Sequence, residues 1–294
     1  MICQICPRNC CAERTENNGT GFCGMGLLPQ IARIAPHKWE EPCISGTNGS
    51  GTIFFSGCVL RCVFCQNEEI SRKSCGKRFS AETLSDAIKD LEQQGVHNIN
   101  LVSPTPYIDM LIECFSKYKP SVPIVWNTGG YEKAETIRRL EGIVDIYLPD
   151  LKYVSDTLAV KYSKAPHYFK YASEAIKEMV RQTGKPVFDN DGLLKRGTIV
   201  RHLVLPNQLI NTYQVLKWLN DTFGSPDEDR ILVSLMAQYF PAGHATDYAE
   251  LNRPLNSREY ERVCRYLEQK TDLNGFVQEL SSATAAYVPD FNMK

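Results

Sequence analysis

Three closely spaced cysteines form the part of the sequence with the clearest chemical meaning. Cys58, Cys62 and Cys65 have the spacing C-x3-C-x2-C and directly follow an apolar, β-rich run at 52–56. In parallel α/β proteins, active-site residues lie at the carboxyl ends of strands, which is where this loop begins. Iron–sulfur clusters normally use four thiolates, so three thiolates can hold three irons of a [4Fe-4S] cubane and leave the fourth iron open. The spacing therefore predicts a catalytic metal site, which also keeps one position free.

A zinc site is the main alternative for this loop. Structural zinc needs four ligands, commonly supplied by two C-x2-C pairs. No histidine lies near the loop in the sequence, although Cys75 can supply a fourth sulfur. The position of the loop after a predicted strand favours an active-site loop over a zinc knuckle.

A second group of cysteines lies near the N-terminus. Cys3, Cys6 and Cys10 have the spacing C-x2-C-x3-C, and Cys23 follows further on. Four such ligands suit structural zinc or an auxiliary iron–sulfur cluster, and the pattern does not distinguish the two. Cys11 can take the place of Cys10.

The composition favours a globular, cytoplasmic protein. The 294 residues include 12 cysteines, mostly near the N-terminus, and in a reducing compartment such groups more often bind metal than form disulfides. The formal net charge of -1 predicts no nucleic-acid partner. No apolar run is long enough to predict a membrane span, and the N-terminus shows no export signal.

Short apolar runs alternate with helical patterns after residue 51. This alternation predicts a parallel sheet of βαβ units, which right-handed crossovers can close into a full or partial barrel. A flat, doubly wound sheet is the other topology. Residues 1–50 are rich in Cys, Gly, Pro and Asn and are predicted to be an irregular extension of a barrel domain at 51–294. The predicted strands are 52–56, 98–102, 124–127, 145–148, 198–205 and 231–235, with a short one at 276–277, and the predicted helices are 81–94, 107–118, 134–140, 172–183, 209–223 and 257–269.

Polar residues near the ends of the later strands are candidates for the same site. Asp150 and Lys152 follow the fourth predicted strand, and alternation places both on one side of the chain. Arg201 lies within the apolar fifth strand, where an unpaired buried charge would be costly, so we expect it to face a polar pocket. His202 then faces the other way, as a structural histidine or a functional one. Gln238, just after the sixth strand, is expected to line the substrate end.

The three-cysteine loop, with Phe64 before its last cysteine, resembles the motif of radical S-adenosylmethionine enzymes. The resemblance is close to the activating enzymes of pyruvate formate-lyase and other glycyl radical enzymes, including a subgroup with an N-terminal Cys-rich segment. It implies a partial (β/α)6 barrel with a [4Fe-4S] cluster on Cys58, Cys62 and Cys65, and with S-adenosylmethionine on the open iron. The segments that carry the resemblance beyond the loop are 6–10, 21–24, 144–153, 201–206 and 235–239.

The resemblance also implies a reaction. In this family the reduced cluster passes one electron to the sulfonium, and the products are methionine and a 5′-deoxyadenosyl radical that abstracts hydrogen from a substrate. A glycine of a partner glycyl radical enzyme is the expected substrate, and a flavodoxin- or ferredoxin-type protein the expected electron donor. A small molecule or another macromolecule is the alternative substrate. A non-catalytic module that binds only zinc is the alternative of another class.

The same resemblance implies roles for individual residues. Phe64 is expected to pack beside the adenine, and Asn67 to hydrogen-bond near the cofactor or to cap the next helix. The D-x-K pair of Asp150 and Lys152 is expected to handle the methionyl carboxylate, sometimes with a cation. Arg201 is expected to face the cofactor.

One segment departs from the family pattern. Many relatives carry a Gly-Gly-Glu element at the end of the second strand, where it meets the amino group of S-adenosylmethionine. This chain has Ser103-Pro104-Thr105-Pro106 there, without an acidic residue. The hydroxyls of Ser103 and Thr105, or backbone carbonyls, are expected to accept those hydrogen bonds instead.

Overall fold

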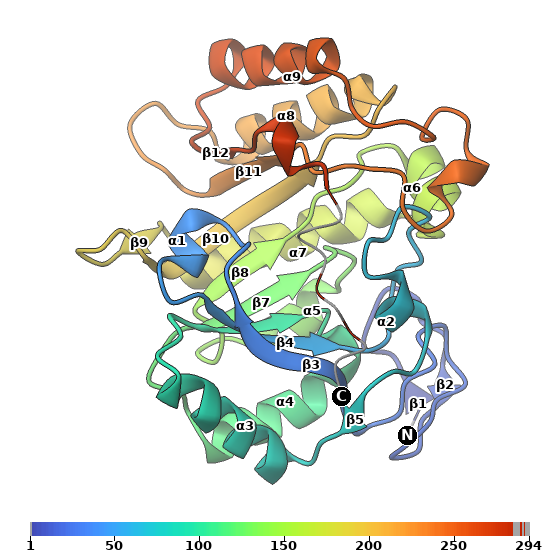
Figure 1. Ribbon diagram of the computed structural model, residues 1–294, viewed down its shortest axis with the longest axis vertical. Helices are drawn as coiled ribbons and strands as arrows, with labels where there is room; N and C mark the ends of the chain where they lie inside the picture. The colour runs from blue at the N-terminus through green and yellow to red at the C-terminus, as the bar shows by residue number, and fades with distance from the viewer. Residues whose placement is uncertain (1, 285–288, 290, 292–294) are drawn as a thin grey trace.

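The computed structural model describes residues 2–284 together with residues 289 and 291. Its centre is a curved sheet of parallel strands with helices packed on the outer face (Figure 1). In the described residues the two end strands of this sheet do not pair with each other, so the sheet is open, and this arrangement agrees with the predicted partial barrel. The parallel strands, in sheet order, are β12 (Gly275–Val277), β11 (Leu232–Met236), β10 (Leu194–Leu203), β8 (Ile146–Pro149), β7 (Ile124–Thr128), β6 (Ile99–Val102) and β4 (Ser50–Phe55).

The predicted parallel strands are confirmed, including the short one at 276–277. Every residue of β4, β7, β8 and β11 is buried, which explains why these strands are mostly apolar and do not alternate with charged residues. β10 begins earlier than predicted, because its first residues pair with β9 (Val187–Phe188) in a hairpin.

The predicted helices are also found, and α3 (Ala81–Gln93) shows why. Its buried residues include Leu84, Ile88 and Leu91, which share one face at helical spacing. Ser80 caps its first turn, where the Thr83 N–H donates to Ser80 Oγ over 3.2 Å. α6 (Asp156–Ser163) was not predicted because it lacks a clear apolar stripe, and the short helices α1 (Pro42–Ser45) and α2 (Glu68–Arg72) were not predicted either. The other confirmed helices are α4 (Ile108–Lys117), α5 (Ala134–Arg138), α7 (Tyr168–Thr183), α8 (Leu209–Phe223) and α9 (Ser257–Lys270).

One long strand of the sheet was not predicted. β3 (Gln30–His37) runs antiparallel to β4 and also pairs with β5 (Lys77–Arg78). Arg33 and Pro36 interrupt its apolar pattern, and the register shifts near Arg33, so the segment shows no regular alternation. The residues before β3 are mostly irregular, as expected, apart from the short pair β1 (Ile2–Cys3) and β2 (Ala12–Glu13).

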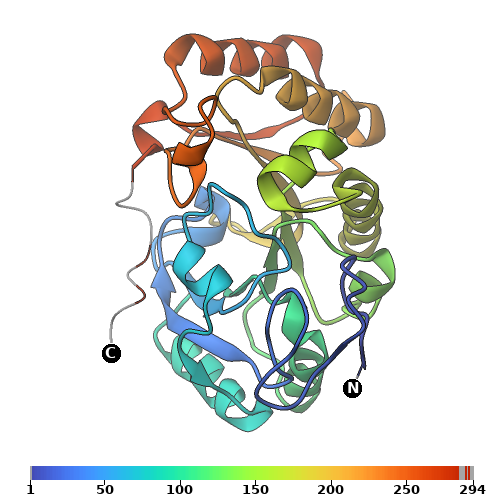
Figure 2. The same cartoon turned by 90° about the vertical axis from the view of Figure 1, so that its right-hand side faces the viewer.

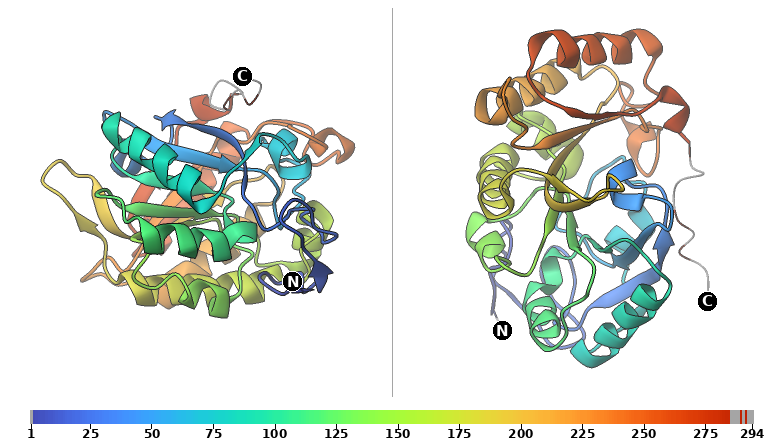
Figure 3. Two further views of the ribbon diagram at one scale, coloured as in Figure 1. Left: turned by 90° about the horizontal axis from the view of Figure 1, so that it is seen from below. Right: turned by 90° about the vertical axis from the view of Figure 1, so that its left-hand side faces the viewer.

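The connection from β3 to β4 enters the inside of the curved sheet. It contains α1 (Pro42–Ser45), which lies near the amino-terminal ends of the strands (Figure 3, right). Ile44 of α1 is fully buried against strand residues such as Val125 and Ile199. The Asn98 side-chain amide donates to the Ile44 carbonyl over 2.7 Å. This connection therefore fills the interior at the amino-terminal ends of the strands. The carboxyl edge of the strands is left for the site.

The carboxyl edge carries the three-cysteine loop and the N-terminal segment. Figure 2 shows this side, with the dark-blue N-terminal segment and the cyan segment of α2 (Glu68–Arg72) toward the viewer. No helix in the described residues has the length and apolar character that crossing a membrane requires.

Candidate functional site

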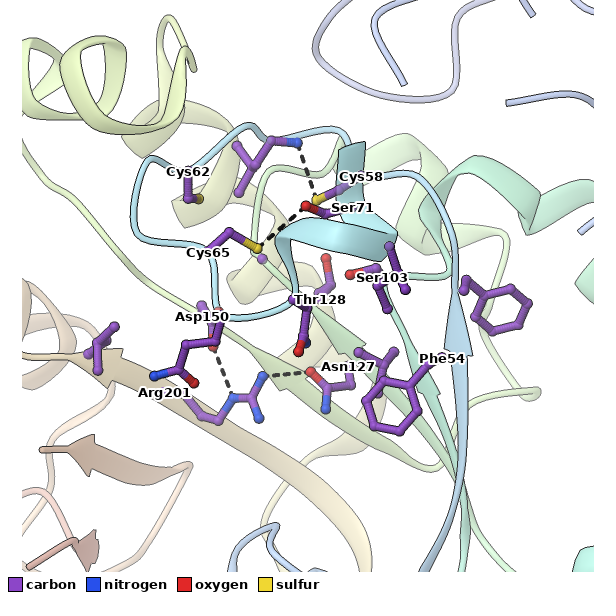
Figure 4. A pocket seen from close by; sticks show the side chains of 18 of the residues that line it. Phe54, Cys58, Cys62, Cys65, Ser71, Ser103, Asn127, Thr128, Asp150 and Arg201 are labelled. Atoms are coloured by element: carbon purple, nitrogen blue, oxygen red, sulfur yellow. Dashed lines mark hydrogen bonds and ion pairs between the residues drawn. The ribbon is translucent and has the colours of Figure 1, made fainter. Parts of the chain in front are cut away.

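The three cysteines of the loop lie at the end of β4 and line one pocket of about 240 Å³ (Figure 4). Each sulfur has a hydrogen-bonding partner. Cys58 Sγ accepts from the Leu60 N–H (3.4 Å), and Cys62 Sγ accepts from the Ser163 hydroxyl (3.0 Å). Cys65 Sγ lies 3.5 Å from the Ser71 hydroxyl. Such partners stabilise negative charge on sulfur, as thiolate ligands of a metal require.

Burial disfavours negative charge on these sulfurs. It raises the pKa of Cys58 to about 12 and that of Cys65 to about 11. Without a metal the thiols of Cys58 and Cys65 are therefore protonated at neutral pH, and binding of a metal displaces their protons. Cys75, considered above as a fourth ligand, contacts the Glu69 carbonyl and lies outside the lining of this pocket.

A row of charged residues crosses the pocket opposite the cysteines. Arg201 Nε donates to Asp150 Oδ1 over 2.9 Å, and Lys152 Nζ donates to Asp150 Oδ2 over 2.5 Å. Burial would raise the pKa of Asp150, but the two positive charges outweigh it and leave this pKa lowered. Burial likewise favours a neutral Lys152, but Asp150 outweighs it and leaves the pKa of Lys152 raised. All three groups are thus charged at neutral pH, and the expected placement of Asp150, Lys152 and Arg201 in one site agrees with the geometry.

Glu40 is a residue of this site that the sequence did not reveal. It lies between β3 and α1, and its Oε2 accepts from Arg201 Nη1 over 3.1 Å. Its Oε1 accepts from the side-chain amides of Asn100 (2.9 Å) and Asn127 (3.2 Å). Asn127 also accepts from Arg201 Nη2 over 2.5 Å, so Arg201 has two carboxylates and one amide around it. No sequence signal connects these residues, because they come from separate strands and one loop.

Phe64, Asn67 and Gln238 also line the pocket. Phe64 is buried and packs edge-on against Tyr239, with ring centroids 6.1 Å apart. Asn67 precedes α2, but among the described residues its side chain makes no capping hydrogen bond, so the capping alternative is not realised. His202 is buried, with Nδ1 2.6 Å from the Leu151 carbonyl and Nε2 3.0 Å from the Thr212 hydroxyl. This places His202 away from the pocket as a structural residue.

Ser103 and Thr105, the two hydroxyl residues after β6, lie in different places. Ser103 lines the pocket and has a φ of 59°, a left-handed conformation that costs energy for a residue with a Cβ. Thr105 lies in the short 3₁₀ helix η1 (Thr105–Tyr107), and its hydroxyl donates to Glu132 Oε1 over 2.5 Å. The structure therefore brings Ser103 to the pocket and leaves Thr105 outside its lining.

The N-terminal cysteines lie at a separate place. Cys3, Cys6, Cys10 and Cys23 line a small cavity that also touches Val59 of the three-cysteine loop. The two groups of cysteines therefore line different cavities, and Val59 of the three-cysteine loop borders the N-terminal one.

The open parallel sheet, with cysteines and charged residues at its carboxyl edge, is the architecture of an enzyme that holds a metal cofactor there. The family model of the Radical SAM superfamily matches residues 52–207, more than half of the chain. The chain therefore belongs to the radical SAM superfamily. Membership implies a [4Fe-4S] cluster, S-adenosylmethionine and oxidoreductase-type radical chemistry. The matched region includes the three-cysteine loop and reaches beyond Arg201.

Similar proteins were found both by sequence and by structure. An uncharacterized protein of Methanocaldococcus jannaschii, MJ0674, is 28% identical over 276 residues, which cover 91% of this chain and 74% of that protein. SuiB of Streptococcus suis, solved with its precursor peptide SuiA, has a TM-score of 0.50 and 17% identity, covering 77% of this chain and 48% of SuiB. HydG, a maturase of the [FeFe]-hydrogenase, has a TM-score of 0.50 and 11% identity, covering 76% of this chain and 49% of HydG. The chain thus spans about half the length of these two solved proteins, and at such identities the likeness shows the fold alone.

Proposed function

We propose that this chain cleaves S-adenosylmethionine reductively, with a [4Fe-4S] cluster held by Cys58, Cys62 and Cys65. The observation that carries the proposal is that three cysteines, each with a polar partner on its sulfur, share one pocket with a charged row. Three thiolates and no fourth cysteine in that lining fit a cluster with one open iron. When bound, the cluster supplies the electron that splits the sulfonium of S-adenosylmethionine into methionine and a 5′-deoxyadenosyl radical.

The residues of the pocket bind and orient S-adenosylmethionine. Lys152 offers its ammonium to the methionyl carboxylate, and Asp150 fixes the position of that ammonium over 2.5 Å. Arg201 holds Asp150 from the opposite side. Phe64 gives an apolar surface for the adenine, and Asn67 and Ser103 offer polar atoms at the rim. The buried ring of Phe64 helps to keep water from the reacting centre.

We propose a glycine in a partner protein as the first substrate. The open sheet leaves the pocket accessible to a large substrate, and SuiB, which shares the fold, has been solved with a bound peptide. A flavodoxin- or ferredoxin-type protein is the proposed electron donor, because the reaction consumes one electron from outside the chain.

The test is anaerobic reconstitution with iron and sulfide, followed by reduction and measurement of 5′-deoxyadenosine. The wild type is expected to form 5′-deoxyadenosine, and Cys62→Ala to form none. Cys75→Ala is the matched control, because Cys75 is also near the loop but outside the pocket lining, and it is expected to behave like the wild type. A wild type that holds only zinc and leaves S-adenosylmethionine intact would contradict the proposal and favour the zinc-binding module. Turnover with a small substrate and no partner protein would contradict the glycine assignment alone.

A further inference from the structure

The four N-terminal cysteines converge although they come from separate local structures. Cys3 lies in β1, Cys6 and Cys10 flank the turn that follows, and Cys23 lies in a second turn. All four line one cavity of about 20 Å³. Cys11, the alternative to Cys10, lies outside that lining and accepts a contact from the Gln4 side chain instead (3.8 Å).

Two backbone turns carry three of the four cysteines to the cavity. In the first turn the Asn9 N–H donates to the Cys6 carbonyl over 3.2 Å, and Asn9 has a φ of 44°. In the second turn the Gly24 N–H donates to the Gly21 carbonyl over 3.0 Å. A Cβ added at Gly21 would lie only 2.8 Å from Cys10 Sγ, so this position needs glycine for the two turns to approach each other.

We propose that Cys3, Cys6, Cys10 and Cys23 bind one zinc ion. Four thiolates that line one cavity are the ligand set of a closed, tetrahedral structural zinc site. A cavity of about 20 Å³ holds roughly one atom-sized sphere, whereas a [4Fe-4S] cubane contains eight atoms. Among the described residues no group of three or more such side chains is placed to hold a metal, and this includes Cys58, Cys62 and Cys65. Ligation at either site therefore requires the cysteine side chains to change position.

The zinc site would fasten the loop that carries the other three cysteines. Arg8, inside the first turn, donates from Nε to the Val59 carbonyl over 2.8 Å, and its guanidinium lies 3.6 Å from the centre of the Phe22 ring. Phe22, next to Cys23, accepts at its carbonyl from Arg61 Nη2 over 2.8 Å. Both turns thus form hydrogen bonds with residues of the segment 58–65. A zinc ion would link the two turns and stabilise this arrangement.

The test uses the full-length chain without its other cysteine site. The variant Cys58→Ala/Cys62→Ala/Cys65→Ala is expected to purify with about one zinc per chain and without iron, as measured by elemental analysis. Adding Cys6→Ser and Cys23→Ser to that variant is expected to abolish the zinc. Adding Cys11→Ser is the matched control and is expected to leave the zinc unchanged. Because the readout is metal content in a variant without the reactive loop, it does not depend on the proposed reaction.

A second measurement covers the case in which the Cys6→Ser/Cys23→Ser variant fails to fold. The folded Cys58→Ala/Cys62→Ala/Cys65→Ala variant, stripped of metal with a chelator, is titrated with Co²⁺. Tetrahedral thiolate ligation is expected to give strong sulfur-to-cobalt absorption that saturates at one Co²⁺ per chain, and zinc is expected to displace it. A chain that purifies without zinc and shows no such absorption overturns the proposal. Iron and acid-labile sulfide in that variant overturn the choice of zinc.

Discussion

Arg201 and Asp150 lie opposite each other in a parallel β-bridge and are also joined through their side chains. The Leu151 N–H donates to the Arg201 carbonyl over 2.8 Å, and the Arg201 guanidinium donates to the Asp150 carboxylate over 2.9 Å. The double connection fixes the position of Asp150 at the end of β8 before any ligand binds. Lys152, on the other oxygen of Asp150, is therefore held toward the pocket by a carboxylate that cannot itself move freely.

Replacing Arg201 should destabilise the protein strongly. Arg201→Met leaves the largely buried carboxylates of Asp150 and Glu40 without their shared cation, and breaking a buried pair in this way costs about 3–5 kcal/mol. Urea unfolding of the purified apoprotein measures this loss. Arg258→Met is the matched control, because Arg258 is exposed on α9, and its effect is expected to stay within about 0.5 kcal/mol. Equal effects of the two substitutions would show that the network contributes nothing to stability.

Lys152→Met should weaken binding of S-adenosylmethionine to the reconstituted protein. A hydrogen bond to a charged group contributes about 1.5–3 kcal/mol, so the Kd is expected to rise about 10–100-fold. Equilibrium dialysis with labelled S-adenosylmethionine gives the Kd directly. Lys161→Met serves as the comparison, since Lys161 pairs with Glu250 at the surface, and its Kd should match that of the wild type. An unchanged Kd in Lys152→Met would remove Lys152 from the proposed binding site.

Ser163→Ala should make the bound cluster harder to reduce. The Ser163 hydroxyl donates to Cys62 Sγ over 3.0 Å, and hydrogen bonds to the cysteine sulfurs raise cluster potentials. A loss of about 1 kcal/mol corresponds to a decrease of about 40 mV for one electron. Redox titration followed by electron paramagnetic resonance measures the potential. Ser173→Ala, on the exposed side of α7, should leave the potential unchanged, and a shift of the same size in both variants would refute the explanation.

Glu132→Gln should change how stability depends on pH. Glu132 is fully buried, and burial raises its pKa from 4.5 to about 7 although Thr105 and Thr128 both donate to it. Between these two values the folded state holds a proton that the unfolded state has lost, so the wild type loses stability as pH rises from 4.5 to 7. Glutamine cannot ionise, so the stability of Glu132→Gln relative to the wild type is expected to increase over that interval by about 3 kcal/mol.

Unfolding measurements at pH 5 and pH 8 test this directly. Glu135→Gln provides the control, since Glu135 is an exposed residue at the start of α5. Its stability relative to the wild type should differ little between the two pH values. If Glu132→Gln behaves in the same way, Glu132 is already ionised in the folded protein.

The sequence was informative where the relevant signal is local. The spacing of Cys58, Cys62 and Cys65 and the position of Asp150 after a buried strand can both be found within a few residues. Glu40 could not be found in this way, because its partner Arg201 is 161 residues away and only the fold brings them together. Thr105 was expected in the pocket, but the left-handed φ of Ser103 and the 3₁₀ helix that follows direct its hydroxyl to Glu132.

β3 illustrates a second limit, which concerns strand recognition. Its sequence contains Arg33 and Pro36, and an edge-side strand with a register shift does not need strict alternation. Its pairing with β4 was therefore not predictable from periodicity, although β4 itself was.

The unpaired ends of the sheet have a consequence for the way in which a long molecule can reach the cysteines. A closed ring of strands would admit a polypeptide only through its mouth, and therefore only by a chain end or a narrow loop. In the described part of this chain the sheet ends at β12 on one side and at β5 on the other. An open sheet of this kind also has a side, between its two unpaired end strands. If the substrate is the polypeptide proposed above, it would lie lengthwise in the open sheet, with the residue to be modified in the middle of a sequence and no need of a free terminus. Pro289 lines the pocket and Phe291 packs against Phe54 of β4, so these residues would have to move aside first.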